Sequence, residues 1–200
     1  MKVYIGSDRN EEIGYLCKTH AELMIPSGFE LIENIDECDI FISILYDKII
    51  DQSFIDSKER CVNFHPGLLP GYRGSGAYSW VLLNREEETG ITVHEIDYNI
   101  DSGPIIDTRT TLIYPKDTAG TLFDRCMKLL YSAFCDNFYD ILYGSYATYP
   151  NHGGKIYLRK QLKEAKDITN IVKAFTFPDK ENCYYYNKEN EKIYIQWETS

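Results

Sequence analysis

The segment from Asp39 to Leu45 constrains the fold of this chain more than any other, because five of its last six residues are apolar. A strand that is apolar at almost every position is typical of a parallel sheet covered on both faces. Residues 1–6 resemble a first strand, and residues 10–25 place apolar side chains at helical spacing. Strand, helix and strand in this order predict an α/β fold, with a mostly parallel sheet flanked by helices.

The same alternation continues up to Gly144. Thr118 is a candidate cap for the longest helix. Residues 66–76 are rich in proline and glycine and are expected to form a loop over a site. The remaining expected elements are strands over 29–32, 61–65, 90–96 and 105–113, and helices over 77–84 and 119–142.

The chain changes character after Gly144, where it becomes polar and rich in tyrosine. Residues 167–175 suggest a short helix, and residues 183–197 have the pattern of a hairpin with a turn at 187–191. We therefore expect a main domain over residues 1–150 and a small C-terminal extension with a β-hairpin over residues 151–200.

The charge balance argues against a nucleic-acid partner. The chain carries 31 acidic and 21 basic side chains, which gives a net charge of −10. Nucleic-acid affinity depends mainly on clustered lysine and arginine. A small anionic substrate, held by a few local cations, is still compatible with this balance.

The cysteines predict a reducing, cytoplasmic environment. None of them forms a Cys-x-x-Cys pair or has a Cys–His spacing typical of zinc, so no metal is expected. Residues 1–6 enter a strand pattern without the features of a signal peptide, and no apolar stretch approaches the roughly 20 residues that span a membrane. The cysteines, expected to be mostly buried thiols, are at positions 17, 38, 61, 126, 135 and 183.

Three polar residues form the candidate catalytic set. Asn63 and His65 end an expected strand and, being two residues apart, face the same side of it. Asp101 lies 38 residues after Asn63, beyond the next strand. Open α/β sheets bind ligands at the carboxyl ends of strands, and an amide, a titratable ring and an orienting carboxylate suit acyl transfer. Each residue alone would more often be a structural loop or turn residue.

The sequence around these residues resembles the folate-dependent formyltransferases, which include glycinamide ribonucleotide, methionyl-tRNA and nucleotide-sugar N-formyltransferases. Three blocks between about Asp39 and Leu130 carry the resemblance: Asn63-x-His65-Pro66-x-Leu-Leu-Pro70-x-Tyr72-Arg73-Gly74, Thr89-Gly90-Ile-Thr-Val-His94 and Asp101-Ser102-Gly103-Pro104. The resemblance implies a Rossmann-like sheet, 10-formyltetrahydrofolate as the formyl donor and a primary amine as the acceptor. It also implies that Asn63, His65 and Asp101 are the catalytic residues.

The expected roles follow from the chemistry of amide formation. The attacking amine must lose a proton, which a positioned imidazole or carboxylate accepts. The developing oxyanion needs hydrogen-bond donors, which the Asn63 amide and a protonated His65 would supply. Asp101 would orient His65 and favour its charged form.

By the same resemblance, two segments would hold the donor. The pterin would lie against the first segment, and the second would close its other side. For Ile49 and Ile50, plain core packing is an equally good explanation. The first segment comprises Tyr46, Asp47, Lys48, Ile49 and Ile50, and the second comprises Asp97, Tyr98, Asn99 and Ile100.

The acceptor is less tightly constrained than the donor. Tyr72, Arg73 and Gly74 are candidates for binding it, although Arg73 could instead fix the loop. Residues 172–178 and the aromatic hairpin are similar to the C-terminal part of sugar N-formyltransferases. A small molecule, the amine of a nucleotide-linked deoxyamino sugar, is therefore the leading acceptor, and methionyl-tRNA and glycinamide ribonucleotide are the alternatives.

A reading from another functional class also stays open. Only 62 residues precede Asn63, fewer than is usual in the family, so part of the wall around the donor could be missing. A folate-binding module with reduced or no activity is the resulting alternative. The C-terminal hairpin, in turn, leads us to expect a homodimer, and no membrane partner is expected.

Overall fold

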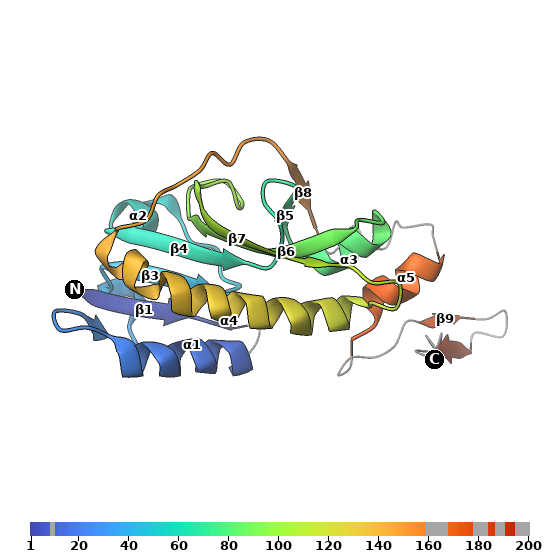
Figure 1. Cartoon of the computed structure of the whole chain (residues 1–200), viewed down its shortest axis with the longest axis horizontal. Coiled ribbons are helices and arrows are strands. Elements are labelled where there is room, and N and C mark those ends of the chain that lie inside the picture. The colour runs from blue at the N-terminus through green and yellow to red at the C-terminus, as the bar shows by residue number, and fades with distance from the viewer. Residues whose placement is uncertain (9–10, 159–167, 178–183, 187–190, 195–200) are drawn as a thin grey trace.

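A six-stranded mixed sheet forms the centre of the molecule (Figure 1). The computed structural model describes residues 1–8, 11–158, 168–177, 184–186 and 191–194. Four neighbouring strands are parallel, and the last two are antiparallel to their neighbours, which confirms the predicted α/β class. In spatial order the strands are β2 (Glu30–Leu31), β1 (Lys2–Gly6), β3 (Ile40–Ile44), β4 (Arg60–His65), β6 (Glu88–Glu95) and β7 (Ile105–Leu112).

Strand β3 lies in the interior of this sheet, and all five of its residues are buried. Ile40, Ile42 and Ile44 point into the main hydrophobic core. Phe41 belongs to a smaller cluster on the opposite face. The unbroken apolar run thus corresponds to a strand covered on both sides, as predicted from its composition.

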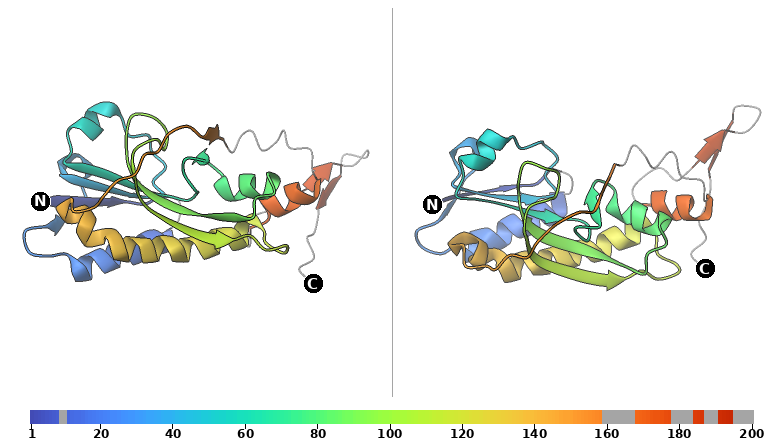
Figure 2. Two further views of the ribbon diagram at one scale, coloured as in Figure 1. Left: turned by 45° about the horizontal axis from the view of Figure 1, so that its top comes forward. Right: turned by 90° about the horizontal axis from the view of Figure 1, so that it is seen from above.

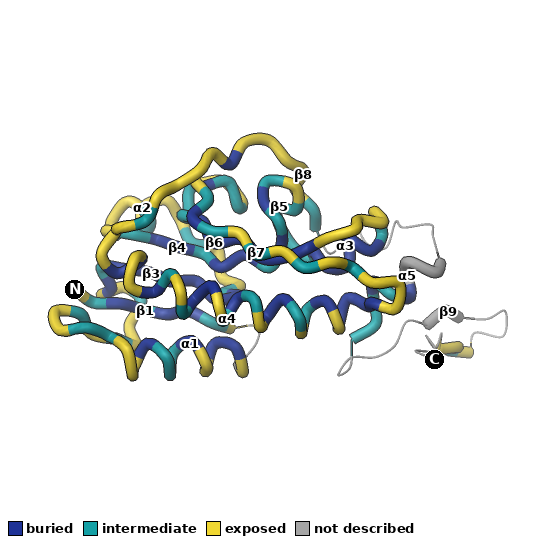
Figure 3. The backbone as a smooth tube through the Cα atoms, in the orientation of Figure 1, coloured by how far each residue is buried: buried dark blue, intermediate teal, exposed yellow. Residues whose placement is uncertain are grey.

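Two long helices cover one face of the sheet. Helix α4 (Ala119–Tyr143) packs on β4, β6 and β7, and α1 (Glu11–Met24) packs on β1 and α4. Both helices lie on the same side of the sheet (Figures 1 and 2), and α4 carries a continuous buried stripe (Figure 3). The stripe includes Leu122, Cys126, Leu130, Ala133, Phe134, Phe138, Ile141 and Leu142. Thr118 caps α4 as predicted, because its hydroxyl accepts the Thr121 backbone N–H at 3.3 Å.

The other face is covered by short elements that the sequence did not reveal. These are a 3₁₀ helix (Ile35–Glu37) and α2 (Gln52–Asp56), which begins at the cap residue Asp51. Phe54 of α2 packs against Phe41 with ring centroids 5.6 Å apart. Because this layer is thin, the carboxyl ends of β3 and β4 stay accessible on this face.

A second group of elements lies beyond the carboxyl end of β4. Helix α3 (Ala77–Leu83) follows β5 (Tyr72–Gly74), which interrupts the loop expected over 66–76 and pairs with β8 (Lys155–Tyr157). Helix α5 (Ile168–Phe175) packs on α3.

The predicted C-terminal hairpin is present. Strand β9 (Tyr184–Tyr186) pairs antiparallel with β10 (Lys192–Tyr194). The turn residues 187–190, Cys183 and Trp197 lie outside the described residues, and the domain boundary at residue 150 stays a prediction. The five described cysteines are free, and four of them are buried. No helix in the described ranges has both the length and the apolar character needed to cross a bilayer.

The carboxylate of Asp117, just before α4, accepts several hydrogen bonds. It accepts hydrogen bonds from the Tyr114 N–H at 2.8 Å, the Thr121 hydroxyl at 2.8 Å and Arg125 at 2.6 Å. Burial favours the protonated form, but these bonds outweigh it and lower the pKa of Asp117. Its stabilising contribution is therefore present above the ordinary pKa of an aspartate and is lost as the pH falls through the lowered value.

We predict that Asp117→Asn lowers the free energy of unfolding by about 1–3 kcal/mol at pH 7, because three donors lose a charged acceptor. The loss should shrink below about pH 4. The matched control is Asp136→Asn, which breaks a 3.1 Å pair with Arg109 whose aspartate is 57% exposed, so it should cost less than about 1 kcal/mol. Urea denaturation measures both variants, and equal losses would contradict the assignment.

Candidate active site

A row of polar side chains crosses the sheet on the face opposite α4. In the strand register, Ser43 of β3 lies opposite Asn63 of β4, and Asn63 lies opposite His94 of β6. His65 lies opposite Thr92. Since residues two apart on a strand share a face, Asn63 and His65 point to the same side, as predicted.

His65 is almost fully buried, with 2% of its surface exposed. Its Nε2 donates to the Tyr72 carbonyl oxygen at 2.7 Å, and its Nδ1 lies 3.4 Å from Oδ2 of Asp101. Because a carbonyl only accepts, the neutral ring keeps its proton on Nε2, and Nδ1 is the nitrogen that can gain one.

The protonation state of His65 differs from the expectation. Burial lowers the pKa of the ring, and His94 lowers it further, against the raising effects of the Asp101 carboxylate and the Tyr72 carbonyl. The net direction is downward. His65 is therefore neutral near pH 7 in the free protein, and the expectation of a charged ring is corrected, because the cost of burying the charge exceeds what Asp101 returns.

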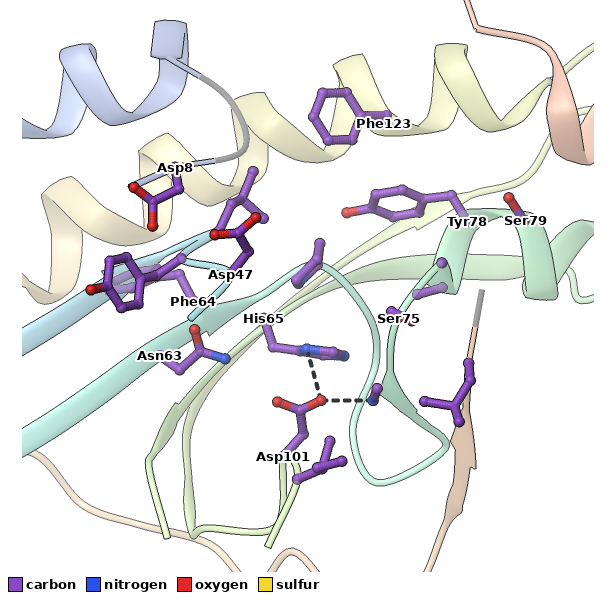
Figure 4. A pocket seen from close by; sticks show the side chains of 18 of the residues that line it. Asp8, Asp47, Asn63, Phe64, His65, Ser75, Tyr78, Ser79, Asp101 and Phe123 are labelled. Atoms are coloured by element: carbon purple, nitrogen blue, oxygen red, sulfur yellow. Dashed lines mark hydrogen bonds and ion pairs between the residues drawn. The ribbon is translucent and has the colours of Figure 1, made fainter. Parts of the chain in front are cut away.

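Asp101 connects two loops with the end of β4. Its backbone is left-handed, with φ at 47°, a conformation that aspartate adopts more readily than most residues. One carboxylate oxygen accepts the Gly74 N–H at 2.7 Å, and the other lies 3.7 Å from Nε2 of His94. Burial alone would raise the pKa of Asp101, but His65, His94 and the Gly74 N–H lower it to about 2. The carboxyl group is therefore ionised, and Figure 4 shows its contact with His65.

The carboxamide of Asn63 is held at both of its ends. Its Oδ1 accepts the Ser43 hydroxyl at 2.7 Å, and its Nδ2 lies 3.1 Å from Nε2 of His94. Figure 4 shows the amide nitrogen on the side of His65 and Asp101. The structure thus brings together Asn63, His65 and Asp101, the three residues that the sequence singled out.

A cavity of about 830 Å³ opens beside these three residues. Its lining includes Leu45, Tyr46, Gly74 and Ile100, together with several carboxylates. The acidic lining residues are Asp8, Glu12, Asp47 and Asp124. No lysine or arginine lies among the described lining residues.

The residues predicted to hold the donor are placed unevenly around this cavity. Tyr46 and Asp47 line it, and so does Ile100 from the second segment. Ile49 is 97% exposed, so it is not a core residue, whereas Ile50 packs with Tyr46 in the smaller hydrophobic cluster. The remaining predicted residues do not line the main cavity. Lys48 lies over the Tyr46 ring, and Tyr98 is exposed. Asp97 and Asn99 line a second, shallower hollow.

Among the predicted acceptor-binding residues, only Gly74 lines the main cavity. Gly74 has a left-handed φ of 94°, and a Cβ there would lie 2.2 Å from the Tyr157 carbonyl oxygen. The Arg73 guanidinium donates to the Ile100 carbonyl at 2.7 Å and to the Gly153 carbonyl at 3.2 Å, which fixes the loop. The ring of Tyr72 stacks on Tyr157 with centroids 5.0 Å apart.

Three residues of the site received no role from the sequence. Ser43 is the one polar position within the apolar run of β3, and His94 ends the Thr-Gly-Ile-Thr-Val-His block, so a signal was present for both. Tyr78 gave no signal. It is 5% exposed and lines the cavity, and its hydroxyl interacts with the Cys126 thiol, a weak hydrogen-bond partner. Figure 4 shows that this hydroxyl is directed into the cavity.

Comparison with known proteins connects this site to a family. The family model of formyl transferases matches residues 21–137, and the model of the N-formyltransferase dimerization C-terminal domain matches residues 155–198. GDP-perosamine N-formyltransferase of Brucella melitensis is 40% identical over 98 residues, which cover 48% of this chain and 38% of that protein. Methionyl-tRNA formyltransferase of Alkaliphilus oremlandii is 38% identical over 99 residues, which cover 49% and 32%. The chain thus spans about a third of the length of these curated relatives.

Solved structures share the fold over nearly the whole chain. A sugar N-formyltransferase from Shewanella superposes with a TM-score of 0.83 at 20% identity, covering 98% of this chain and 97% of the other. The N-formyltransferase of Helicobacter canadensis, in complex with folinic acid and dTDP-3-aminofucose, gives a TM-score of 0.74 at 20% identity, with 88% and 80% covered. Since the formyl transferase model covers more than half of the chain, from residue 21 to residue 137, the protein belongs to the formyl transferase family.

Proposed function

We propose that this chain transfers the formyl group of 10-formyltetrahydrofolate to the amine of a nucleotide-linked deoxyamino sugar. The convergence of Asn63, His65 and Asp101 on one cavity carries this proposal. Family membership supports formyl transfer. The Brucella relative, named for GDP-perosamine, and the Helicobacter canadensis neighbour, bound to dTDP-3-aminofucose, support a sugar amine as the acceptor.

His65 is the proposed general base. Its Nε2 proton is engaged by the Tyr72 carbonyl, so Nδ1 carries the free electron pair. As the neutral amine attacks the formyl carbon, its proton passes to Nδ1. The imidazolium that forms lies 3.4 Å from the ionised Asp101 carboxylate, which stabilises the positive charge. A proton acceptor that starts neutral and ends beside an anion suits this step. The tetrahedral species would then collapse: the bond from the formyl carbon to the folate nitrogen breaks, and that nitrogen takes the proton from Nδ1 as tetrahydrofolate leaves.

Asn63 is the proposed oxyanion donor. One of its amide hydrogens points at His94, and the other has no partner among the described residues. A hydrogen bond from that N–H would stabilise the negative charge on the formyl oxygen as the tetrahedral species forms. Loss of a single such donor lowers kcat by about 10²–10³-fold in well-studied enzymes.

The walls of the cavity fit the donor. Leu45, Tyr46 and Ile100 provide apolar and aromatic surface next to the catalytic residues, as a flat ring system requires. 10-Formyltetrahydrofolate would supply the activated formyl group, and these residues would hold and orient it.

The acidic residues that line the cavity fit a sugar better than they fit phosphates. An amino sugar presents an amine and hydroxyl groups, which donate hydrogen bonds to carboxylates such as Asp8, Asp47 and Asp124. The buried Tyr78 hydroxyl, which has only the weakly hydrogen-bonding Cys126 thiol beside it, would pair with one sugar hydroxyl. The same lining, together with the net charge of −10, would repel a polyanion such as tRNA.

The C-terminal region supports a homodimer. Residues 155–198 match the model of a dimerization domain, and the described part of this region includes the β9–β10 hairpin. We therefore propose that two copies associate through this region.

We predict that His65→Asn and Asp101→Asn each lower kcat by at least about 10²-fold while the protein stays folded, because each removes part of the proton-accepting pair. Asp107→Asn on β7 is the matched control and should keep its activity. Tetrahydrofolate release is measured with GDP-perosamine, dTDP-3-aminofucose, glycinamide ribonucleotide and methionyl-tRNA as acceptors. Near-wild-type kcat in either variant would refute its role. Release with tRNA alone would favour the alternative acceptor, and release with none would favour a folate-binding module.

The protonation states make a separate prediction for the free protein. The pKa of His65 should lie below 6.5, the ordinary value for histidine, and Asp101→Asn should lower it further, because the raising effect of the carboxylate is lost. Titration by ¹⁵N NMR measures both values, with Asp107→Asn as the control that leaves the pKa of His65 unchanged. A higher pKa in the Asp101→Asn variant would contradict this electrostatic account.

A further prediction concerns the hydroxyl of Tyr78. Tyr78→Phe should raise the KM for the acceptor by about 2- to 10-fold, as expected for one lost hydrogen bond, and should change stability by less than about 1 kcal/mol, because the hydroxyl has only the weakly hydrogen-bonding Cys126 thiol to lose in the free protein. Tyr146→Phe is the control. Its hydroxyl donates a 3.0 Å hydrogen bond to the Glu95 carboxylate, and neither residue lines the cavity. Its loss should therefore lower stability and leave KM unchanged. A Tyr78→Phe variant with lower stability and unchanged KM would show that the hydroxyl is structural.

A further inference from the structure

We propose that His94 and Ser43 are positioning residues that determine which way round the Asn63 carboxamide lies. An asparagine amide has two nearly isosteric ends, of which only the nitrogen end donates hydrogen bonds. If Asn63 acts as an oxyanion donor, an amide turned by 180° would present an oxygen to the developing negative charge. The inference rests on the proposed function only for this consequence, since the orientation itself is a property of the free protein.

The orientation begins with a backbone carbonyl. Nδ1 of His94 lies 2.7 Å from the carbonyl oxygen of Glu95. A carbonyl can only accept a hydrogen bond, so Nδ1 carries the proton, and a neutral His94 exposes a lone pair at Nε2. That lone pair faces Nδ2 of Asn63 at 3.1 Å, whereas the Asp101 carboxylate oxygen, 3.7 Å from the same nitrogen, lies beyond hydrogen-bond distance. Turned over, the amide would place its oxygen against this lone pair, and the two acceptors would repel each other.

Ser43 holds the other end of the amide. Its hydroxyl donates to Oδ1 of Asn63 at 2.7 Å, and the Ser43 side chain is 5% exposed, so water cannot readily replace it. With the two contacts made, one amide hydrogen is used by His94, and the second is left for a ligand.

The fold itself puts the three residues in line. Ser43, Asn63 and His94 are direct neighbours in the register of β3, β4 and β6. A shift of one residue along either strand would turn one of them to the opposite face. The buried strands β3 and β6 are therefore part of the catalytic apparatus through their side chains, although neither Ser43 nor His94 needs to touch the substrate.

The two partners call for different tests. His94 also lies 3.7 Å from Oδ1 of Asp101, so a substitution there would disturb two catalytic residues at once. Ser43 contacts Asn63 without such a second contact to the catalytic residues among the described hydrogen bonds. The role of His94 is best observed in the unmodified protein, and the role of Ser43 is best measured by substitution.

The first experiment needs no activity. In the ¹⁵N-labelled full chain, a through-hydrogen-bond ¹⁵N–¹⁵N coupling is measured between Nδ2 of Asn63 and Nε2 of His94, with the amide signal assigned by its disappearance in Asn63→Ala. A resolved coupling is the expected result, because only the proposed orientation places an N–H between these nitrogens. A His94 ring that carries its proton on Nε2, with no coupling to Asn63, would overturn the proposal whether or not the protein is a formyltransferase.

The second experiment is a double-mutant cycle in kcat. Ser43→Ala should lower kcat by about 3- to 10-fold, the effect of one lost hydrogen bond, with acceptor KM changed less than about 2-fold. In the Asn63→Ala background the same substitution should have no further effect, since Ser43 acts through Asn63. Ser43→Thr, which keeps a hydroxyl, should recover activity if it folds.

Stability changes are separated by a control. Thr118→Ala removes the cap of α4 and should lower stability by about 1 kcal/mol without changing kcat, so destabilisation alone does not mimic the Ser43 effect. Equal reductions in kcat on Ser43→Ala in both backgrounds would show that Ser43 acts independently of Asn63, and would overturn its assignment. A coupling that is present in a chain without formyl transfer would refute the proposed function and leave the positioning intact.

Discussion

The carboxylate of Asp101 connects every part of the candidate site. It lies 3.4 Å from Nδ1 of His65 at the end of β4 and accepts the Gly74 N–H at 2.7 Å from the loop beyond it. Its second oxygen faces His94 of β6 at 3.7 Å. Because Asp101 is held ionised within a largely buried setting, it both joins two loops to the sheet and provides the one negative charge next to the proposed base. Removing that charge would therefore change the geometry and the proton affinity of the site together.

The site depends on the sheet as much as on the loops. The apolar residues of β3 that face α4 hold the strand in the core, while the next residue along, Ser43, supplies a hydroxyl on the opposite face. The same alternation in β4 points Asn63 and His65 towards the cavity. The apolar residues buried on one face of the sheet therefore fix the strand register. That register in turn determines which polar residues lie side by side on the opposite face of the sheet. A thin covering layer, with α2 as its main helix, leaves that face open to a ligand.

Much of this arrangement could be predicted from the sequence, for physical reasons that differ between elements. The uniformly apolar run of β3 and the helical spacing in α4 are strong local signals, and the elements match them closely. Asn63, His65 and Asp101 could be grouped because they follow strand ends whose positions in a sheet are constrained. The short α2 and the strand β5 gave little signal, because five- and three-residue elements depend on tertiary contacts. The neutral state of His65 and the place of the Tyr78 hydroxyl in the cavity could not be predicted, since both depend on burial.

The lining of the cavity combines apolar and acidic side chains. Leu45, Tyr46 and Ile100 contribute apolar and aromatic surface, and Asp8, Glu12, Asp47 and Asp124 contribute carboxylates. Asn63, His65 and Asp101 line the same cavity, where under the proposed function the formyl carbon and the amine would meet. Two residues predicted to bind the acceptor have other contacts in the structure. Arg73 fixes the loop that contains Gly74 by donating to the carbonyls of Ile100 and Gly153. Gly74 donates its backbone N–H to the Asp101 carboxylate.

The most direct test of the central claim is to follow the formyl carbon itself. The full chain is incubated with 10-formyltetrahydrofolate labelled with ¹³C in the formyl group and with an amino-sugar nucleotide such as dTDP-3-aminofucose or GDP-perosamine, and the label is observed by NMR. The account predicts a formamide signal attached to the sugar nitrogen, which forms with the wild-type chain and not with His65→Asn. Label that stays in the donor, or appears only as free formate, would contradict it.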